Sequence, residues 1–323
     1  MTKYVISGYI GFDNFGDEAI VKVLTTHLRN INAEKITVLS SNPNKTAKLY
    51  NVESVNFLKF IKPILESDVL ISGGGSLLQD ITSLKSLIYY LAVIVTALVF
   101  NKKVIIFAQG FTPFRTKIGK FLTKFVLKYC DKIYIRDSKS QSMLSSMNLN
   151  SELIADPVFS IEIPSIESKN GVGVQLRNYS TLNNSFLESL ANEIAKNFPN
   201  ETIKIFSLQN SIDYEVSIKF AELLKNKNIK AKIYDNMEID ETINEISNLE
   251  YLIAMRFHAC LVGAKAGVKT LGINYDVKVL NLSNMIGFPI VNLDKTNLSE
   301  EFEKIFSIGV KKYNIPEFKF PEL

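Results

Sequence analysis

The chain has 323 residues, of which 46% are hydrophobic and 22% are charged, and its formal net charge is +4. This length is sufficient for two domains, because a single hydrophobic core seldom grows beyond roughly 250–300 residues, and the composition excludes a disordered chain. The two cysteines have neither disulfide-framework nor zinc-site spacing, so we expect Cys130 and Cys260 to be buried thiols of a cytoplasmic protein.

Short apolar runs alternate with helical patterns through the first half of the chain. The apolar runs predict strands at 4–7, 36–41, 69–72, 104–108, 133–135 and 153–155. The patterns between them predict helices near 17–30, 83–100, 116–130 and 138–147. Because continuous apolar strands that alternate with helices indicate a parallel sheet covered on both faces, we expect residues 1–162 to form a Rossmann-like domain. The first residues lead directly into a predicted strand, so we expect no secretion signal.

Around residues 160–170 the alternation lapses into Pro, Ser, Glu and Lys, which predicts a linker at 163–170. The alternation then resumes in 171–323. The strands predicted there are 172–176, 203–208, 231–234, 251–254, 270–273 and 290–292. The predicted helices are 184–197, 213–226, 238–247, 258–266, 276–286 and 298–308. The fold class is therefore α/β, with two doubly wound Rossmann-like domains. Ligands of such sheets bind beyond the carboxyl ends of the strands, and we expect them in a cleft between the two domains.

The first domain also contains an apolar segment and a basic helix face. The uncharged segment 86–100 is shorter than the ~20 residues that span a bilayer, so we expect a buried helix. The basic face consists of Lys117, Lys120, Lys124 and Lys128, which recur at helical spacing. This face is either solvated or attracted to anionic lipid headgroups. Nucleic acid binding is not expected, since no recognition motif accompanies the patch.

A glycine-rich loop, GYIGFDNFGDEA, follows the first predicted strand. Its glycines allow close approach of backbone amides to a ligand, and Asp17 can cap the helix that follows. A tight turn and a helix cap would explain this much without a ligand. Asp13 and Asn14, however, add polar side chains where a substrate would lie. The spacing differs from the dinucleotide fingerprint, so a nicotinamide cofactor is not expected.

A second glycine loop follows the strand at 69–72. Three consecutive glycines, Gly73, Gly74 and Gly75, are costly for chain entropy unless the backbone must pass close to something. Exposed N–H groups of this kind can bind an anion or a sugar. Gln109, which precedes Gly110 after the next strand, repeats the arrangement.

Three cations and one imidazole occur at or just beyond strand ends: Arg136, Arg256, His258 and Lys278. Arg136 can fork onto a carboxylate or phosphate, although an ion pair with Asp137 would also explain it. Lys278 could likewise be a solvated lysine at a helix end. His258 opens a predicted helix, where the helix dipole disfavours imidazolium and helps the side chain to cycle through its neutral form. The other histidine, His27, lies mid-helix and is expected to be a surface or core residue. The set suits a small, highly anionic substrate.

Seven motifs resemble, in order and spacing, those of polysaccharide pyruvyltransferases, and most of all the bacterial members that modify the wall polymers anchoring surface layers. They are GYIGFDNFGDEAI, SGGGSLLQD, AQGFTPF, YIRDSKS, IADPVF, AMRFHA and INYDVKV, and they extend from Gly8 to Val279. The resemblance implies a glycosyltransferase-B-like pair of domains, phosphoenolpyruvate as donor and no metal or other cofactor. It also implies that sugar hydroxyls are the acceptors and that a pyruvate ketal is the product.

Carried over by motif position, the resemblance implies that Arg136, His258 and Lys278 act on the donor, and we add Arg256 because it is next but one to His258. It implies that the loop with Asp13, Asn14 and Asp17 faces the acceptor, and we group the glycine loop and Gln109 with it. The first domain is thus the expected acceptor side and the second the expected donor side. His258 is the predicted acid–base catalyst, because forming the ketal requires proton transfers near neutral pH.

Two other functions fit parts of the pattern. A nucleotide-sugar glycosyltransferase of the same architecture would also use glycine loops and cations, in that case to hold a diphosphate. A non-catalytic glycan- or lipid-binding module would leave the cations and histidine unexplained. For the pyruvyltransferase, the expected partners are phosphoenolpyruvate, a polyprenyl-linked glycan acceptor and the anionic inner face of the plasma membrane.

Overall fold

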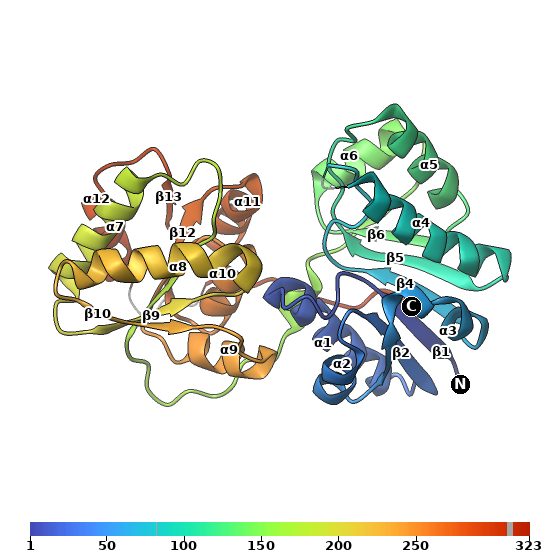
Figure 1. The fold of residues 1–323 in the computed structure, drawn as a ribbon, viewed down its shortest axis with the longest axis horizontal. Helices are drawn as coiled ribbons and strands as arrows, with labels where there is room; N and C mark the ends of the chain where they lie inside the picture. The colour runs from blue at the N-terminus through green and yellow to red at the C-terminus, as the bar shows by residue number, and fades with distance from the viewer. Residues whose placement is uncertain (82, 309–312) are drawn as a thin grey trace. The chain divides into compact units, whose positions relative to one another are not determined.

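The computed structural model describes residues 1–81, 83–308 and 313–323 and divides into two compact α/β units (Figure 1). The first unit comprises Met1–Ile161 together with Phe318–Leu323, and the second comprises Glu162–Glu317. Nothing in the pattern of residues 318–323 separates them from the residues that precede them, so they were expected in the second domain. In the structure they pack within the first unit.

The first unit is built on a seven-stranded parallel sheet with the order β3-β2-β1-β4-β5-β6-β7. Its strands are β1 (Lys3–Ser7), β2 (Lys35–Ser40), β3 (Glu53–Asn56), β4 (Val69–Gly73), β5 (Lys103–Gln109), β6 (Lys132–Ile135) and β7 (Glu152–Leu153). The central strands are apolar on both faces, and Ile105–Phe107 of β5 is fully buried. Burial on both faces accounts for the continuous apolar runs in the sequence.

The described residues of this unit form six α-helices that connect these strands. They are α1 (Phe15–Asn30), α2 (Pro43–Tyr50), α3 (Ile61–Leu65), α4 (Leu84–Val99), α5 (Lys117–Leu127) and α6 (Ser138–Ser146), with the 3-10 helices η1 (Phe57–Lys59) and η2 (Pro157–Ser160). The strand order reverses direction between β1 and β4, so right-handed crossovers place α1 and α2 on one face of the sheet and α4 and α5 on the other (Figure 1). Side chains cap several helix starts, including Asn14 at α1, Thr116 at α5 and Asp137 at α6.

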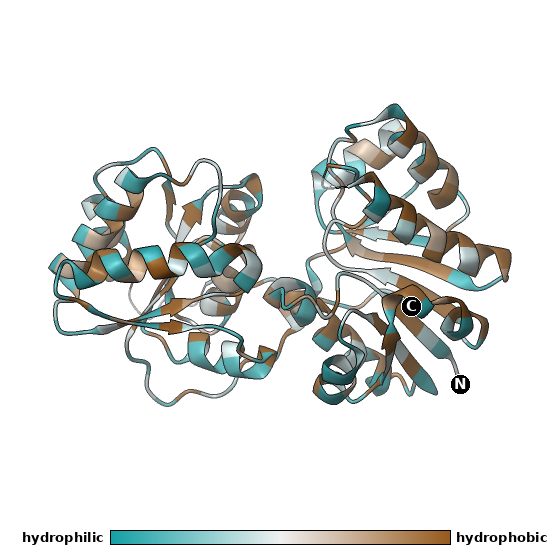
Figure 2. Ribbon diagram, viewed as in Figure 1, coloured by the Kyte–Doolittle hydropathy of each residue, from teal (hydrophilic) through white to brown (hydrophobic). Residues whose placement is uncertain are grey.

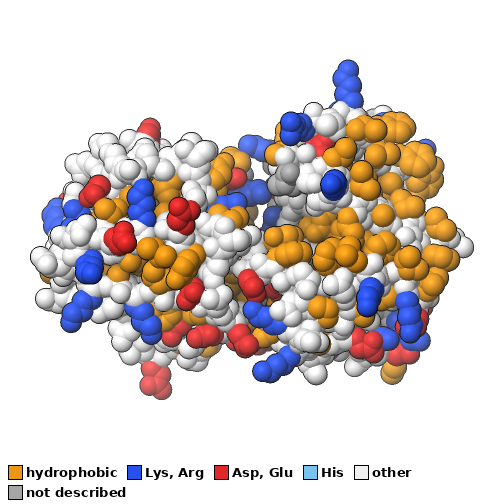
Figure 3. Space-filling model, in the orientation of Figure 1, with side chains coloured by type: hydrophobic (Ala, Val, Ile, Leu, Met, Phe, Trp, Pro, Cys, Tyr) orange, Lys and Arg blue, Asp and Glu red, His pale blue; other side chains and the backbone are white. Residues whose placement is uncertain are grey.

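Hydropathy follows this layered arrangement, with apolar strands between helices of mixed character (Figure 2). The helices α4 and α5 depart from it, because hydrophobic side chains also spread over their outer surface (Figure 3). The apolar segment at 86–100 thus forms a helix as predicted, but only one of its faces is buried. Within the described part of the chain, no helix combines the length and hydropathy needed to cross a bilayer.

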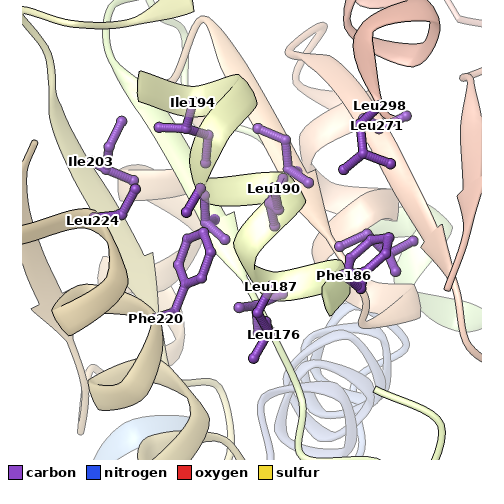
Figure 4. Close-up of a cluster of buried hydrophobic side chains, with 14 of the residues drawn as sticks. Leu176, Phe186, Leu187, Leu190, Ile194, Ile203, Phe220, Leu224, Leu271 and Leu298 are labelled. Carbon is purple, nitrogen blue, oxygen red and sulfur yellow. The ribbon is translucent and has the colours of Figure 1, made fainter. Parts of the chain in front are cut away.

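The second unit is built on a six-stranded parallel sheet with the order β10-β9-β8-β11-β12-β13. Its strands are β8 (Val172–Gln175), β9 (Thr202–Phe206), β10 (Lys230–Tyr234), β11 (Tyr251–Ala254), β12 (Lys269–Asn274) and β13 (Ile290–Asn292). Its helices are α7 (Asn184–Asn197), α8 (Asn210–Lys225), α9 (Ile239–Ser247), α10 (Phe257–Lys265), α11 (Val277–Ile286) and α12 (Ser299–Ser307). In Figure 4, Leu190 and Ile194 of α7 lie among side chains of β9, α8 and β12. This cluster is the main core of the unit.

The predicted fold class is confirmed, since both sheets are parallel and flanked by helices. The second unit contains all six strands and all six helices that the sequence predicts for it, with ends that differ by up to three residues. In the first unit β3, α2 and α3 were not predicted. The strand β3 is short and partly exposed, with the sequence ESVN, and therefore has no apolar run to mark it.

Candidate active site

The loop after β1 is held by its own polar side chains. Asp13 has a φ of 54°, and its carboxylate pairs with Lys45 at 2.6 Å while remaining 57% exposed. Asn14 caps α1 by accepting a hydrogen bond from the N–H of Gly16, and its amide donates to Asp17 at 2.6 Å. Of the three polar residues predicted to face a ligand, Asp13 is therefore the exposed one. Asn14 and Asp17 also shape the start of the helix.

Glu18 stabilises this loop through a hydrogen bond to its backbone. It was not among the residues predicted from the sequence. Its carboxylate accepts a hydrogen bond from the N–H of Gly11 at 2.8 Å and another from the hydroxyl of Tyr50. Burial raises the pKa of Glu18, although both hydrogen bonds act in the opposite direction. The N–H of Gly11 is thus committed to the protein.

The second glycine loop needs its glycines for backbone reasons. Gly74 and Gly75 have φ values of 79° and 62°, in the left-handed region that side chains other than glycine rarely adopt. A Cβ on Gly75 would also lie 2.8 Å from a carboxylate oxygen of Asp17, so the two glycine loops meet at this point. Gln109 lies fully buried behind the loop and donates to the carbonyl and hydroxyl of Ser72, each at 3.0 Å. Gln109 thus joins the carboxyl end of β5 to that of β4.

Arg136 lies beside this loop. Its guanidinium donates to Asp156 at 2.8 Å and to the carbonyl of Gly75 at 3.3 Å, and its side chain is 13% exposed. Asp156 itself is buried. The ion-pair partner is therefore Asp156, not Asp137, whose carboxylate instead caps α6. Asp17, Gly75 and Arg136 come together at the carboxyl edge of β1, β4 and β6.

In the second unit, Arg256 belongs to a buried network. Its guanidinium forms a bidentate ion pair with Asp213, with both N–O distances at 2.7 Å, and it also donates to Gln209 at 3.0 Å. The same carboxylate accepts hydrogen bonds from the backbone N–H of Leu208 and from the side chain of Gln175. The network ties the ends of β8, β9 and β11 to α8. The side-chain nitrogens Nε and Nη2 of Arg256 thus donate to buried side chains.

His258 and Lys278 occupy equivalent places. His258 is the second residue of α10, which follows β11, and Lys278 is the second residue of α11, which follows β12. The two strands are hydrogen-bonded neighbours, so both side chains lie at one edge of the sheet. His258 is half-buried and its ring meets Phe257 edge-on at 5.0 Å, whereas Lys278 is exposed. Asp276 caps α11 by accepting from the N–H of Lys278.

The same edge holds two residues that the sequence analysis missed. Arg177 follows β8, the other neighbour of β11, and its guanidinium lies over the ring of Tyr275 at 5.7 Å. Its hydrogen bond to the Tyr275 hydroxyl is long, at 3.5 Å, and among the described residues its Nε has no hydrogen-bond partner. Burial raises the pKa of Tyr275, while Arg177 and Arg256 act against that rise. The sequence could have indicated Arg177 as a candidate site residue, because it directly follows a predicted strand, as Arg136 does.

The carboxyl edge of β8, β11 and β12 thus presents Arg177, His258, Tyr275 and Lys278 from one sheet. This combination can bind an anion and move a proton. Within residues 1–81, 83–308 and 313–323, no group of three or more His, Cys, Asp or Glu side chains is arranged to hold a metal ion.

Solved structures with a similar fold include UDP-GlcNAc 2-epimerases and glycosyltransferases. The UDP-GlcNAc 2-epimerase from Methanocaldococcus jannaschii is 13% identical, with a TM-score of 0.66 over 98% of this chain and 95% of that one. A glycosyltransferase from Rickettsia africae is 13% identical, with a TM-score of 0.64 over 95% and 88%. Anabaena HepE in complex with UDP and glucose is 7% identical, with a TM-score of 0.63 over 95% and 90%. These likenesses confirm a glycosyltransferase-B-like fold.

No curated protein matches the sequence. The family model for polysaccharide pyruvyl transferases, however, matches residues 14–277. The matched range contains the end of the first glycine loop from Asn14 onward, the whole second glycine loop, Arg136, Arg177, His258 and Tyr275, and it ends one residue before Lys278. It extends over most of both units. This chain therefore belongs to the polysaccharide pyruvyl transferase family.

Proposed function

We propose that this chain transfers the pyruvyl group of phosphoenolpyruvate to sugar hydroxyls of a surface or cell-wall polysaccharide precursor, forming a pyruvate ketal and releasing phosphate. Family membership over residues 14–277 carries the proposal. The basic and imidazole side chains at the carboxyl edge of the second sheet support it, because the donor has a carboxylate and a phosphate to bind.

The reaction defines what the protein must supply. A proton is added to C3 of the donor, an acceptor hydroxyl oxygen bonds to C2, phosphate leaves, and a second hydroxyl closes the ketal ring. One hydroxyl proton replaces the proton used to form the methyl group, and the other leaves with phosphate. A side chain that both gives and takes a proton is required, and we propose His258 for this role.

We propose Arg177 and Lys278 as the cations of the second unit that hold the donor. Arg177 has the planar fork that suits a carboxylate or phosphate, and its guanidinium is oriented by Tyr275. Arg256 was expected to bind the donor, but its bidentate pair with Asp213 supports a positioning role, since it holds the backbone from which His258 projects.

The first unit is the proposed acceptor side. Asp13 is the most exposed polar residue predicted to bind the sugar, and the second glycine loop, which meets the first at Asp17, offers backbone groups. The assignment of Arg136 to the donor stays a prediction. We further propose that the acceptor is carried on a polyprenyl lipid, so that the enzyme works at the inner face of the plasma membrane.

A nucleotide-sugar glycosyltransferase is the second candidate, and the fold likeness to HepE in complex with UDP and glucose favours it. Ligand-induced stabilisation separates the two. A ligand at 100 times its dissociation constant stabilises the folded state by about 2.7 kcal/mol. We expect phosphoenolpyruvate to raise the melting temperature and UDP-sugars to leave it unchanged. The opposite result would overturn the proposal in favour of the glycosyltransferase.

Variants locate the donor site in the same assay. Arg177→Ala and Lys278→Ala should reduce the shift caused by phosphoenolpyruvate. Arg136→Ala also removes the partner of the buried Asp156, so Arg136→Lys is the better test there, since it can keep the ion pair but loses the fork. For each variant the shift on ligand addition is compared, not the melting temperature itself. Parental affinity in all three variants would show that the donor binds elsewhere.

A further inference from the structure

The helix α5 exposes large hydrophobic side chains along one side. Its buried residues are Gly119, Thr123, Val126 and Leu127, of which two are not large hydrophobics. Three of its large apolar side chains, and the tyrosine just beyond its end, face outward: Ile118 is 56% exposed, Phe121 64%, Phe125 55% and Tyr129 55%. Surface helices normally bury such a stripe.

The exposed stripe is a continuous structural feature. The rings of Phe121 and Phe125 are stacked at 6.4 Å, and Phe125 meets Tyr129 at 5.5 Å. The neighbouring α4 adds an aliphatic stripe at helical spacing, formed by Leu84, Ile88, Val95 and Val99, each at least 38% exposed. Figure 3 shows these two helices as a region rich in hydrophobic side chains. We call this surface the α4–α5 face.

The α4–α5 face is basic, which indicates an anionic partner. Residues 81–130, which include both helices, contain eight basic side chains and not one Asp or Glu. Four of these, Lys117, Lys120, Lys124 and Lys128, are exposed, and each comes one residue before a member of the exposed stripe of α5. None of the four forms an ion pair with the described residues. Protein–protein interfaces are depleted in lysine, which is the most frequent charged residue of this face. Lysines beside Phe and Tyr suit the boundary between anionic headgroups and acyl chains.

We infer that the α4–α5 face docks on an anionic lipid bilayer, with the aromatic and aliphatic stripes entering the headgroup boundary and the lysines contacting the lipid phosphates. Docking places the helices on the surface and not across the membrane, in keeping with their length. The surface is held ready in the folded protein. Asp80 accepts hydrogen bonds from the backbone N–H groups of Arg115 and Thr116, at 2.6 and 2.9 Å, and so fixes the start of α5. This inference does not depend on the transfer reaction.

Vesicle flotation tests the electrostatic part. The parent should float with vesicles of equal phosphatidylcholine and phosphatidylglycerol, less so at high salt, and not with phosphatidylcholine alone. Each lysine near an anionic surface is worth about a fivefold change in partitioning, so changing Lys117, Lys120, Lys124 and Lys128 to Gln should lower it by at least about a hundredfold. The matched control changes four exposed lysines of the second unit, Lys219, Lys225, Lys230 and Lys232, to Gln. It alters the net charge equally and should float like the parent.

A fluorescence probe tests the insertion part, because the chain has no tryptophan. Phe125→Trp should show a blue shift with the anionic vesicles and be quenched by brominated lipid. Tyr214→Trp, at an exposed position of α8, should show neither. Phe121→Ser combined with Phe125→Ser should lower flotation about tenfold or more.

Three outcomes would overturn the inference: equal losses in the two lysine sets, identical responses of the two tryptophan probes, or a parent that does not bind the anionic vesicles. Light scattering adds a further check. A parent that dimerises through this face, and loses the dimer but not flotation in the double serine variant, would make a second copy the true partner. Stabilisation by phosphoenolpyruvate should be the same in all these variants, so failure of the membrane inference is distinguishable from failure of the proposed reaction.

Discussion

His258 is one of only two histidines in the chain, and its position at the second residue of α10 makes a sharp test possible. His258→Gln keeps much of the volume and hydrogen-bonding capacity of the side chain but cannot carry a proton. We expect turnover to fall by roughly 10²–10⁴-fold, the usual contribution of a positioned acid–base group, and saturating phosphoenolpyruvate should not restore it. The limb of the pH–rate profile that depends on histidine should disappear.

The matched control is His27→Gln, which lies in the first unit and should leave turnover unchanged. If the role of His258 is only to bind the donor, high phosphoenolpyruvate will restore the rate of His258→Gln, and the assignment to proton transfer will have to be withdrawn. Near-parental turnover at all donor concentrations would remove His258 from the mechanism altogether.

The arginines show what sequence can and cannot tell about single residues. Arg136, Arg177 and Arg256 all follow predicted strands, and the parallel-sheet pattern is enough to place them at a carboxyl edge. Their roles depend on partners that are distant in sequence. Asp213 is 43 positions from Arg256 and sits in a helix, where a lone Asp looks like any other surface residue. Only folding brings it to the interior, so sequence reasoning could not separate a positioning arginine from a binding one.

At the scale of elements, the Asp213 network determines how three strand ends are joined. Removing Asp213 leaves the guanidinium of Arg256 buried without its partner. We expect Asp213→Ala to lower the free energy of unfolding of the second unit by about 3–5 kcal/mol, as is usual when one member of a buried ion pair is lost. Chemical denaturation followed by circular dichroism measures it.

The control for this prediction replaces both partners. Asp213→Leu together with Arg256→Met removes both charges and should recover much of the lost stability, because no buried charge then remains. If the single and double variants are equally destabilised, the hydrogen bonds that Asp213 accepts from the backbone N–H groups of Leu208 and Gln209 matter more than the ion pair. If neither variant is destabilised, the network does not hold the strand ends together.

Elements were predictable where the hydrophobic pattern is strong. The second sheet has six strands separated by helices, and each strand, including the edge strand β10 with the sequence KAKIY, was predicted from a run of its own. The strand β3 was missed because an edge strand needs few apolar residues. The lysines of α5 indicated an exposed face, but the exposure of Phe121 and Phe125 beside them was not predicted, because a helix with aromatic residues on one side is expected to turn that side inward.

At the scale of the whole chain, the last residues complete the first unit. Phe320 stacks on His27 with ring centroids 3.8 Å apart and also packs on Phe107, and the carbonyl of Glu322 accepts a hydrogen bond from Tyr134. Burial lowers the pKa of His27 below its usual value. The folded state therefore favours the neutral ring, and protonation opposes the packing of the C-terminal segment.

The pH dependence follows with a definite sign. Between about pH 6.5 and the lower pKa of folded His27, the unfolded state binds more protons, so the first unit should lose stability as the pH falls through this window. Thermal unfolding at a series of pH values would show it. His27→Gln should flatten this part of the profile, while His258→Gln should keep it. A profile that is identical in the parent and in His27→Gln would contradict the prediction.

Because residues 318–323 pack within the first unit, the second unit is an insertion in the chain of the first. On a ribosome, the first 161 residues are complete long before the segment that closes their core exists. At about 5–20 residues per second, synthesis of the intervening 156 residues takes roughly 8–30 s. Throughout that interval Phe320 has not yet been synthesised, so the surface of His27 and Phe107 on which it packs is uncovered. A chaperone can recognise this apolar site on the nascent first unit. The second unit is made without such a gap and can fold before the first is finished.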